Sequence, residues 1–394
     1  EELNKEYDQV MQTIEYLRTL LADRKMRLDV VRTELIEVRD KYAEDRRTDL
    51  TVGENEINIE DLIQRSIVAI TVSNTGYIKR QSVDTFKTQR RGGKGIIGMQ
   101  TKEEDYVAHL FLACTHDYLL FFTNKGQMHW LKVYEIPEAQ RQSRGKAMVN
   151  LLNLQKDEYI RAMLTLEEVE GDDKFLVFST RKGYIKKTAL SEFANLRRVG
   201  LRAIKIEEDD DLIDVKMTNG EQQIMLFSAE GMACRFNEDE VRPMGRASRG
   251  VTGMRLGKRA DDEVVAMEVV ENGIELLTIT SLGQGKRSNI GTGVSELDTD
   301  VDGYRLTRRG SKGVINIRLR DDDKVTAVKI VNPGDELMIS TVAGQIVRIS
   351  TDEIRTMGRN TAGVRAISLR DGDEVSAVSI VPDLKDEDDD EEIE

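Results

Sequence analysis

Residues Lys182-Gly183-Tyr184-Ile185-Lys186-Lys187 contain a turn glycine followed by a short strand that ends in two cations. An apolar strand precedes them, and a polar residue followed by glycine between two such strands predicts a β-hairpin. The same arrangement occurs six times along the chain. Its turn glycines are Gly76, Gly126, Gly183, Gly231, Gly283 and Gly344.

A second glycine follows each turn glycine at a similar interval, except in the fifth unit, where the longer interval indicates an insertion. An acidic turn and a strand rich in Val, Ala and Met complete each unit. A period of about 50 residues is typical of stacked or radial β-units. We therefore predict a mostly β fold, a six-bladed propeller-like disc over residues 65–382. The second glycines are Gly95, Gly145, Gly200, Gly250, Gly313 and Gly363.

Residues 1–45 contain neither Gly nor Pro, and their apolar residues recur at alternating steps of four and three, with Arg24 as the one polar break. This 3.5-residue period predicts one long α-helix of a coiled coil over residues 1–48, whose partner helix is another chain or an upstream segment. A lone amphipathic helix lying on the β-domain is the alternative. Residues 49–64 are expected to form a linker and entering strand. The apolar residues are Val10, Ile14, Leu17, Leu21, Leu28, Val31, Leu35, Val38 and Tyr42.

Composition limits the class of protein. The chain has 394 residues and a net charge of −14, of which residues 383–394 contribute −8 from nine acids and one Lys. We expect these last residues to be a disordered acidic tail, and local patches rather than net charge to identify partners. Two cysteines without a CxxC pair favour a reducing cytoplasm, and no apolar run is long enough to span a membrane. The non-Met start suggests a fragment of a longer protein.

Catalytic chemistry finds little support in the sequence. His109, His116 and His129 lie close together along the chain, with Cys114 between the first two, and no carboxylate motif orients them. They are expected to be ordinary strand residues rather than a nucleophile or metal site. The chain also lacks a GxxxxGK[ST] phosphate loop. We therefore expect neither a catalytic residue nor a metal or cofactor in this chain.

Cations, in contrast, recur at equivalent positions of the repeats. The densest group is Gln89-Arg90-Arg91-Gly92-Gly93-Lys94-Gly95, with three cations and three glycines in one short run. Stacked radially, the repeats would form one basic rim and collect their acidic turns on another edge. Because Trp130 is the only Trp, base stacking on single strands is disfavoured and duplex backbone contact, without sequence specificity, is favoured. The predicted rim residues are Lys79, Arg80, Lys87, Arg141, Arg144, Lys186, Lys187, Arg197, Arg198, Arg235, Arg246, Arg249, Lys286, Arg287, Arg308, Arg309, Lys312, Arg348 and Arg359.

The segment from Gln89 to Gly95 resembles the A-box heptapeptide of the C-terminal domain family of DNA gyrase A subunits. Stretches along essentially the whole chain are also similar to that family. They include residues 45–48 and 59–63, which resemble the junction leaving the coiled-coil arm of those proteins. The other stretches are residues 103–105, 113–117, 149–152, 225–231 and 357–361.

The resemblance implies a six-bladed β-pinwheel that wraps DNA around its basic rim with a fixed hand. In the family this wrapping enables ATP-dependent negative supercoiling. DNA cleavage and ATP hydrolysis, with their ATP and Mg²⁺, belong to other parts of the parent enzyme, so the resemblance implies a non-catalytic fragment. The implied partners are double-stranded DNA, the rest of a dimer of gyrase A subunits, and gyrase B subunits, in an A2B2 assembly in the cytoplasm at the nucleoid. The alternatives are the C-terminal domain of a topoisomerase IV A subunit and a propeller that docks proteins.

Overall fold

The computed structural model describes most of the chain as two compact units, Glu1–Leu62 and Ile63–Glu394. The described residues are 1–44, 59–73, 75–82, 107–140, 143–167, 173–195, 199–257, 262–271, 273–291, 303–320, 322–343 and 345–381. The predicted acidic tail, most of the predicted linker and the Gln89–Gly95 segment lie outside these ranges. The predicted domain boundaries at residues 48 and 382 therefore stay predictions.

The first unit contains two α-helices, α1 (Glu2–Ala22) and α2 (Arg24–Tyr42), and a short 3-10 helix, η1 (Ile59–Leu62). The sequence predicts one helix here, and the structure divides it at Asp23, whose backbone is extended with φ −100° and ψ 116°. The Asp23 carboxylate accepts a hydrogen bond from the backbone N–H of Lys25 at 2.8 Å, which caps the start of α2. Neither helix buries a residue, so no described residue covers the apolar seam.

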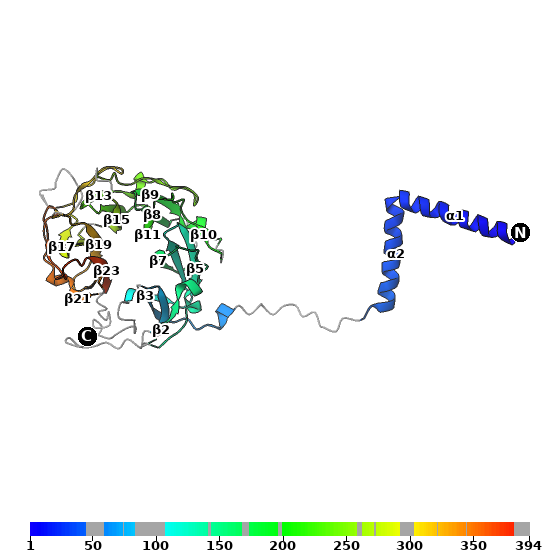
Figure 1. Cartoon of the computed structure of the whole chain (residues 1–394), viewed down its shortest axis with the longest axis horizontal. Coiled ribbons are helices and arrows are strands. Elements are labelled where there is room, and N and C mark those ends of the chain that lie inside the picture. Colours follow the sequence, from blue (N-terminus) through cyan, green and yellow to red (C-terminus); the bar gives the residue numbers. More distant parts are fainter. Residues whose placement is uncertain are drawn as a thin grey trace, which may run out of the picture. The chain divides into compact units, whose positions relative to one another are not determined.

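The second unit is a ring of six antiparallel sheets, or blades, shown in Figure 1. This confirms the predicted six-bladed propeller-like fold. Each blade is built on a hairpin. The hairpins are β1 (Ile67–Ser73) with β2 (Tyr77–Ser82), β4 (Tyr118–Thr123) with β5 (Gln127–Lys132), β8 (Phe175–Thr180) with β9 (Tyr184–Ala189), β12 (Gln223–Ser228) with β13 (Met232–Asn237), β16 (Glu275–Thr280) with β17 (Gln284–Asn289), and β20 (Glu336–Thr341) with β21 (Ile346–Ser350).

A third strand pairs with the first strand of each hairpin and faces the centre of the ring (Figure 1). These inner strands are β3 (Val107–Cys114), β7 (Ile160–Leu166), β11 (Leu212–Thr218), β15 (Val264–Val270), β19 (Val325–Val331) and β23 (Val375–Val381). Two-residue outer strands pair with the second hairpin strand of blades 1 to 5. They are β6 (Lys146–Ala147), β10 (Leu201–Arg202), β14 (Val251–Thr252), β18 (Val314–Ile315) and β22 (Val364–Arg365).

Each outer strand belongs to the following sequence repeat, so neighbouring blades exchange strands. A segment that we call a strap connects the hairpin of each repeat to the outer strand of the same repeat. That outer strand pairs with the preceding blade, so the strap lies on the preceding blade. The straps run over residues 133–145, 190–200, 238–250, 290–313 and 351–363, with short gaps outside the described residues. Most of them begin with a single 3-10 turn: η3 (Val133–Glu135), η5 (Leu190–Phe193), η6 (Glu238–Glu240) and η7 (Thr351–Glu353). A further turn, η4 (Met148–Asn150), follows β6.

In repeats 2 to 6, the second glycine allows the strap to lie flat on the preceding blade. Gly145 has φ +82°, and a Cβ there would lie 2.5 Å from the carbonyl oxygen of Ile78 and 2.9 Å from the Lys79 Cβ. Only glycine fits both this backbone conformation and this close approach. The strand exchange therefore depends on a residue type that the sequence places at the same point of every repeat.

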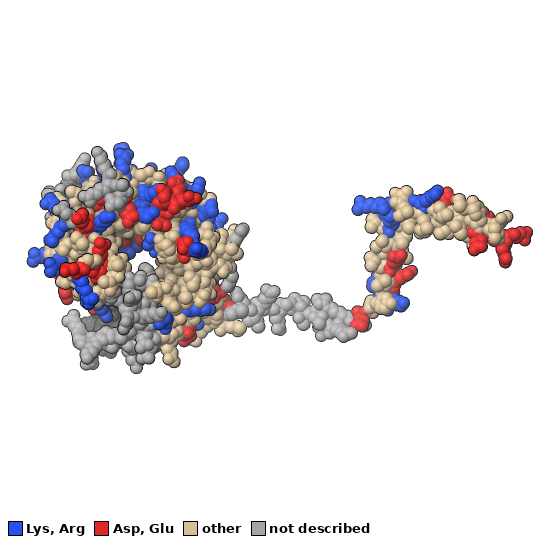
Figure 2. All heavy atoms as spheres, in the orientation of Figure 1, with Lys and Arg blue, Asp and Glu red and all other residues tan. Residues whose placement is uncertain are grey.

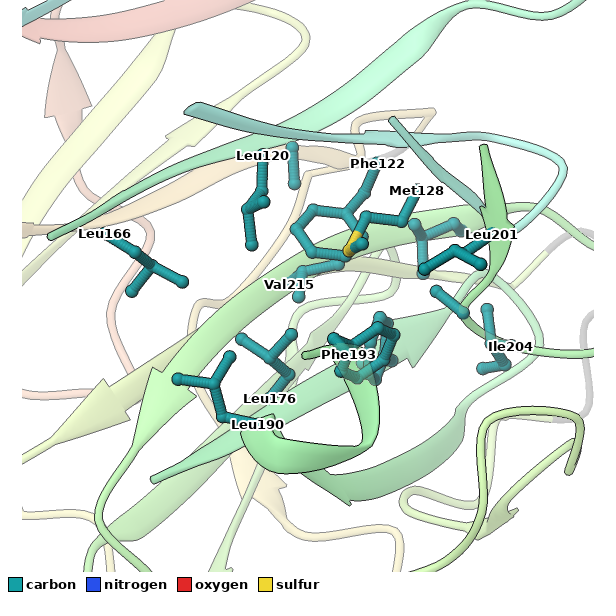
Figure 3. Packing of buried hydrophobic residues seen from close by; sticks show 14 residues of the cluster. Leu120, Phe122, Met128, Leu166, Leu176, Leu190, Phe193, Leu201, Ile204 and Val215 are labelled. Carbon is teal, nitrogen blue, oxygen red and sulfur yellow. The ribbon is translucent and has the colours of Figure 1, made fainter. Parts of the chain in front are cut away.

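Hydrophobic cores lie between neighbouring sheets, as Figure 3 shows for blades 2 and 3. Phe122 of blade 2 and Phe178 of blade 3 pack edge to face with ring centroids 5.6 Å apart. Leu201, from outer strand β10, is buried in the same cluster. Since a fully buried side chain of this size contributes about 1.5–3 kcal/mol, these contacts hold both the blades and the exchanged strand in place.

At the centre, one carboxylate links the inner strands of blades 3, 4 and 5. Glu268 on β15 lies 3.0 Å from the Lys216 ammonium on β11 and 3.9 Å from that of Lys329 on β19. Asp214 also lies 3.5 Å from Lys216. Burial lowers the pKa of Lys216, but the two carboxylates outweigh burial and raise this pKa above its usual value. No described helix is both long and apolar enough to cross a membrane.

Candidate nucleic-acid interface

The outer edge of the ring is formed by the second hairpin strands and the straps. Figure 2 shows Lys and Arg spheres along the visible outer edge, interrupted by Asp and Glu. Many of the predicted rim cations are at least partly exposed there, and they differ in their contacts. These residues are Arg80, Arg144, Arg246, Arg249, Arg287, Arg308, Arg309, Lys312, Arg348 and Arg359.

Five predicted rim cations are enclosed by the fold instead of facing solvent. Lys79, Lys186 and Lys286 are 0% exposed, Arg235 is 1% and Lys187 is 4% exposed. A cation at the end of a strand looks the same in the sequence whether or not another segment covers it. The straps, which arrive from the next repeat, cover these side chains. We therefore remove them from the set of proposed phosphate ligands.

The buried amines bind strap carbonyls. The Lys79 Nζ donates to the carbonyl oxygens of Gln140 at 3.3 Å and Ser143 at 3.0 Å. The Lys286 Nζ donates to those of Gly358 at 3.0 Å and Arg359 at 2.6 Å. Burial lowers the pKa of Lys79. The third residue of the second hairpin strand thus fastens the strap of the following repeat in blades 1 and 5.

Blades 2 and 4 carry other residues at this third position. In blade 4 it is Cys234, whose Sγ lies within 3.5 Å of the hydroxyl oxygens of Thr307 and Ser311 on its strap. In blade 2 it is His129, which is buried and 3.9 Å from the Glu158 carboxylate. Burial lowers the pKa of His129, and Glu158 partly opposes this effect. His129 and Cys234 are therefore both enclosed in the packing of their blades, and the expectation that His109, His116 and His129 are ordinary strand residues stays a prediction.

Several exposed rim cations are neutralised by carboxylates. Arg249 pairs with Glu207 at 2.5 Å, and the guanidinium of Arg348 pairs with Glu336. The guanidinium groups of Arg80 and Arg287 likewise bind acidic side chains and backbone carbonyls of neighbouring segments. Those of Arg309 and Arg359 bind only backbone carbonyls among the described residues, and the backbone N–H of Arg309 donates to the Glu240 carboxylate. Such residues hold the straps and supply less free charge to a ligand.

Four predicted rim cations on the straps have neither a carboxylate nor a backbone carbonyl as a partner for their side chains among the described residues. Arg246 belongs to the strap on blade 3, and Arg308 and Lys312 belong to the strap on blade 4. Arg144, on the strap of blade 1, lies over the ring of Tyr77 at 5.4 Å. They are the strongest candidates for phosphate contacts. The predicted A-box residues Gln89, Arg90, Arg91, Gly92, Gly93, Lys94 and Gly95, with Lys87, Arg141, Arg197 and Arg198, lie outside the described residues.

Sequence reasoning missed the cations that follow the second glycine. Lys146, Arg202 and Arg365 are exposed on the outer strands β6, β10 and β22. They lie just beyond the second glycine of each unit, whereas all the predicted rim residues lie between the two glycines. The second glycine could have identified these cations, because the residues directly after it form the outermost strand of a blade.

The acidic turns have a structural role in addition to their charge. One Asp from each of four turns is buried and accepts a hydrogen bond from a backbone N–H in the hairpin turn of the same blade. The N–H donors and their Asp partners are Lys182 with Asp210, Glu230 with Asp262, Leu282 with Asp323, and Ala343 with Asp373. Among the described residues, no group of three His, Cys, Asp or Glu side chains is arranged to hold a metal ion.

A ring whose blades exchange their outer strands, with cations on the exchanged segments, defines a β-pinwheel, a propeller-like class of domain. A family model described as "DNA gyrase C-terminal domain, beta-propeller" matches residues 69–114, 117–167, 174–219, 222–271, 275–292, 299–332 and 335–382. The chain therefore belongs to the DNA gyrase C-terminal domain family, as the resemblance of its sequence predicts.

Relatives and solved structures agree with this assignment. The chain is 41% identical over 362 residues to the DNA gyrase A protein of Staphylococcus aureus strain Mu50, and 40% identical to that of strain MRSA252. The match covers 91% of the chain and 39% of the length of each relative. The structure is similar to the C-terminal domain of DNA topoisomerase IV, with a TM-score of 0.67 and 25% identity over 81% of this chain and 94% of that one. A DNA gyrase A C-terminal domain shares the fold, with a TM-score of 0.61 and 24% identity over 80% of this chain and 99% of that one.

Proposed function

We propose that this chain binds, bends and wraps duplex DNA around the outer edge of its ring, without sequence specificity. The proposal is carried by four predicted rim cations on the straps, which are at least partly exposed and whose side chains have neither a carboxylate nor a carbonyl partner among the described residues. They are Arg144, Arg246, Arg308 and Lys312. Straps recur around the ring, so the same kind of contact is available at successive blades. A curved row of cations exchanges the cost of bending DNA for additional phosphate contacts.

Membership in the gyrase family supports a role within a larger enzyme. We propose that wrapping presents one duplex segment to another, which enables ATP-dependent negative supercoiling by a parent gyrase. In this proposal the chain works in the cytoplasm with the rest of a dimer of gyrase A subunits and with gyrase B subunits in an A2B2 assembly. ATP and Mg²⁺ would act elsewhere in that assembly, and the box residues Gln89–Gly95 would begin the wrap.

A topology assay tests wrapping. Closed circular DNA is incubated with the chain and relaxed by a separate topoisomerase, and the linking number is read after the protein is removed. Wrapping with a fixed hand predicts a shift in linking number that increases with protein concentration and has one sign. An unshifted distribution would refute wrapping.

Salt dependence provides a second test. Each phosphate that the protein neutralises contributes about −0.9 to the slope of log affinity against log salt concentration. Binding by several strap cations predicts a steep negative slope on linear duplex DNA. A flat response would favour the alternative of a protein-docking propeller.

The likeness to a topoisomerase IV C-terminal domain supports a second candidate within the same class. Such a domain would bind duplex DNA without wrapping it around the whole ring. A steep salt dependence combined with an unshifted linking number would support this candidate. The identity of 41% to gyrase A proteins favours the first.

A further inference from the structure

A hollow of about 590 Å³ lies at the outer edge of the ring, where the straps of blades 2 and 3 meet. One wall is the end of the strap on blade 2 and its outer strand β10. The other wall is the strap on blade 3, and the backbone N–H of Lys205 joins the two walls by donating to the Ser248 carbonyl oxygen at 3.1 Å. The lining residues are Glu192, Gly200, Leu201, Arg202, Gly245, Arg246, Ala247 and Ser248.

Two arginines give this hollow an excess of positive charge. Arg202 is exposed and Arg246 is half-buried, and neither guanidinium has a hydrogen-bond or carboxylate partner among the described residues. Glu192 is the one carboxylate in the described lining. Guanidinium groups that the protein leaves unpaired at a concave surface are suited to phosphate oxygens, which they bind through two parallel N–H donors.

A third cation is fixed next to the hollow. The Lys186 side chain is 0% exposed, and its Nζ donates to the carbonyl oxygens of Ala203 at 2.6 Å and Arg246 at 2.5 Å. It therefore sits between the two walls, with the Phe178 ring centroid 5.4 Å away. Burial, and then the charge of Arg246, lower the pKa of Lys186 to about 7, while Glu192 opposes them. An anion in the hollow would act on Lys186 in the same direction as Glu192.

We propose that this hollow is a phosphate-binding notch that grips the backbone of duplex DNA at the junction of blades 2 and 3. Arg202 and Arg246 contact the phosphodiester, the enclosed Lys186 holds the two walls together behind them without touching the phosphate, and Glu192 limits the affinity. The proposal rests on the proposed DNA-binding function and adds a specific contact point to it. It also gives a role to Arg202, which lies outside the predicted rim.

The test measures duplex affinity from 50 to 200 mM salt for the whole chain and for the double variant R202A/R246A, with a labelled linear duplex. Loss of two phosphate contacts should make the log–log slope less steep by about 1.8. Over this fourfold change in salt concentration, the affinity of the wild type should then fall about 12-fold more than that of the double variant. Both side chains reach solvent, and a thermal unfolding curve confirms that the variant folds.

Two further variants make the test specific. R161A removes an exposed arginine of inner strand β7 that donates a hydrogen bond to the Tyr159 hydroxyl. This control should leave the slope of log affinity against log salt concentration unchanged. E192Q removes the opposing charge and should tighten binding about threefold, the effect of a unit charge about 6 Å away in water. The notch would be overturned if R202A/R246A kept the wild-type salt slope, or if R161A reduced the slope as much as R202A/R246A does. Weaker DNA binding by E192Q than by the wild type would also overturn it.

The outcomes separate this proposal from the one on which it rests. A wild-type chain with a flat salt response contradicts DNA binding as a whole, and the notch with it. A steep wild-type slope that R202A/R246A does not change leaves DNA wrapping in place and refutes the notch alone.

Discussion

The strap glycines offer a direct test of how the blades are joined. Gly145 and Gly273 have nearly the same positive φ, +82° and +84°. A Cβ at Gly145 would meet the Ile78 carbonyl oxygen at 2.5 Å, whereas a Cβ at Gly273 would meet nothing within 4 Å. Gly145→Ala and Gly273→Ala therefore share the cost of a left-handed alanine and differ only in the clash.

The expected losses follow from this difference. An alanine at positive φ costs about 1 kcal/mol at either site. At Gly145 the strap must also move away from β2, where β6 pairs Tyr77 with Ala147 and Ile78 with Lys146. Losing this pairing, with the carbonyls left unpaired beside it, adds about 2–3 kcal/mol. We expect Gly145→Ala to lower the free energy of unfolding by about 3–4 kcal/mol and Gly273→Ala by about 1 kcal/mol.

Urea unfolding of both variants and the wild type, followed by circular dichroism, measures these losses. The comparison is valid where the dependence of stability on urea is the same in all three proteins. Equal losses in the two variants would show that the close approach of the strap contributes nothing to stability. The role assigned to the second glycines of repeats 2 to 6 would then be refuted.

Three further predictions concern the charged side chains that the fold encloses or pairs. Lys286→Met leaves two strap carbonyls without a donor and should cost about 1–3 kcal/mol in thermal unfolding; an unchanged midpoint would contradict the fastening role. Glu268→Gln should cost about 1–3 kcal/mol, because it removes one of the two carboxylates that pair with the half-buried Lys216 and leaves only Asp214, and this cost should be smaller when Lys216 is already Met in a double-mutant cycle. Burial lowers the pKa of Lys186 to about 7 from 10.5, so the unfolded chain binds more protons between these values. Stability should therefore rise with pH across this window, by up to about 1.4 kcal/mol per unit, and Lys186→Met should flatten the rise in urea unfolding at pH 7 to 9.

The repeat pattern predicted the fold because every blade uses the same local chemistry. A polar residue before Gly183 makes a hairpin turn whatever surrounds it, since the turn needs a positive φ that glycine adopts freely. The 3.5-residue period likewise predicted helix at the N-terminus. The break at Asp23 was less visible, because a single carboxylate that caps a new helix looks like any polar residue of the heptads.

The rim shows where sequence reasoning ends. The repeats placed cations such as Lys79 and Arg246 between the two glycines of a unit, but sequence alone could not tell that one is enclosed and the other reaches solvent. That difference depends on straps that arrive from the next repeat, far along the chain from the strand that they cover. The same long-range contact brought Arg202 and Arg246 together at one hollow, although they belong to different repeats.

The sequence by itself determined the number of blades, the hairpins and the positions of the two glycines, because these follow from local backbone preferences and periodicity. Only the tertiary structure decided which cations bind strap carbonyls and which remain free for a ligand. Burial is a property of the neighbours that the fold supplies, and for a strand-exchanged ring those neighbours come from another repeat. The electrostatic surface of this protein is therefore a consequence of the exchange rather than of its composition.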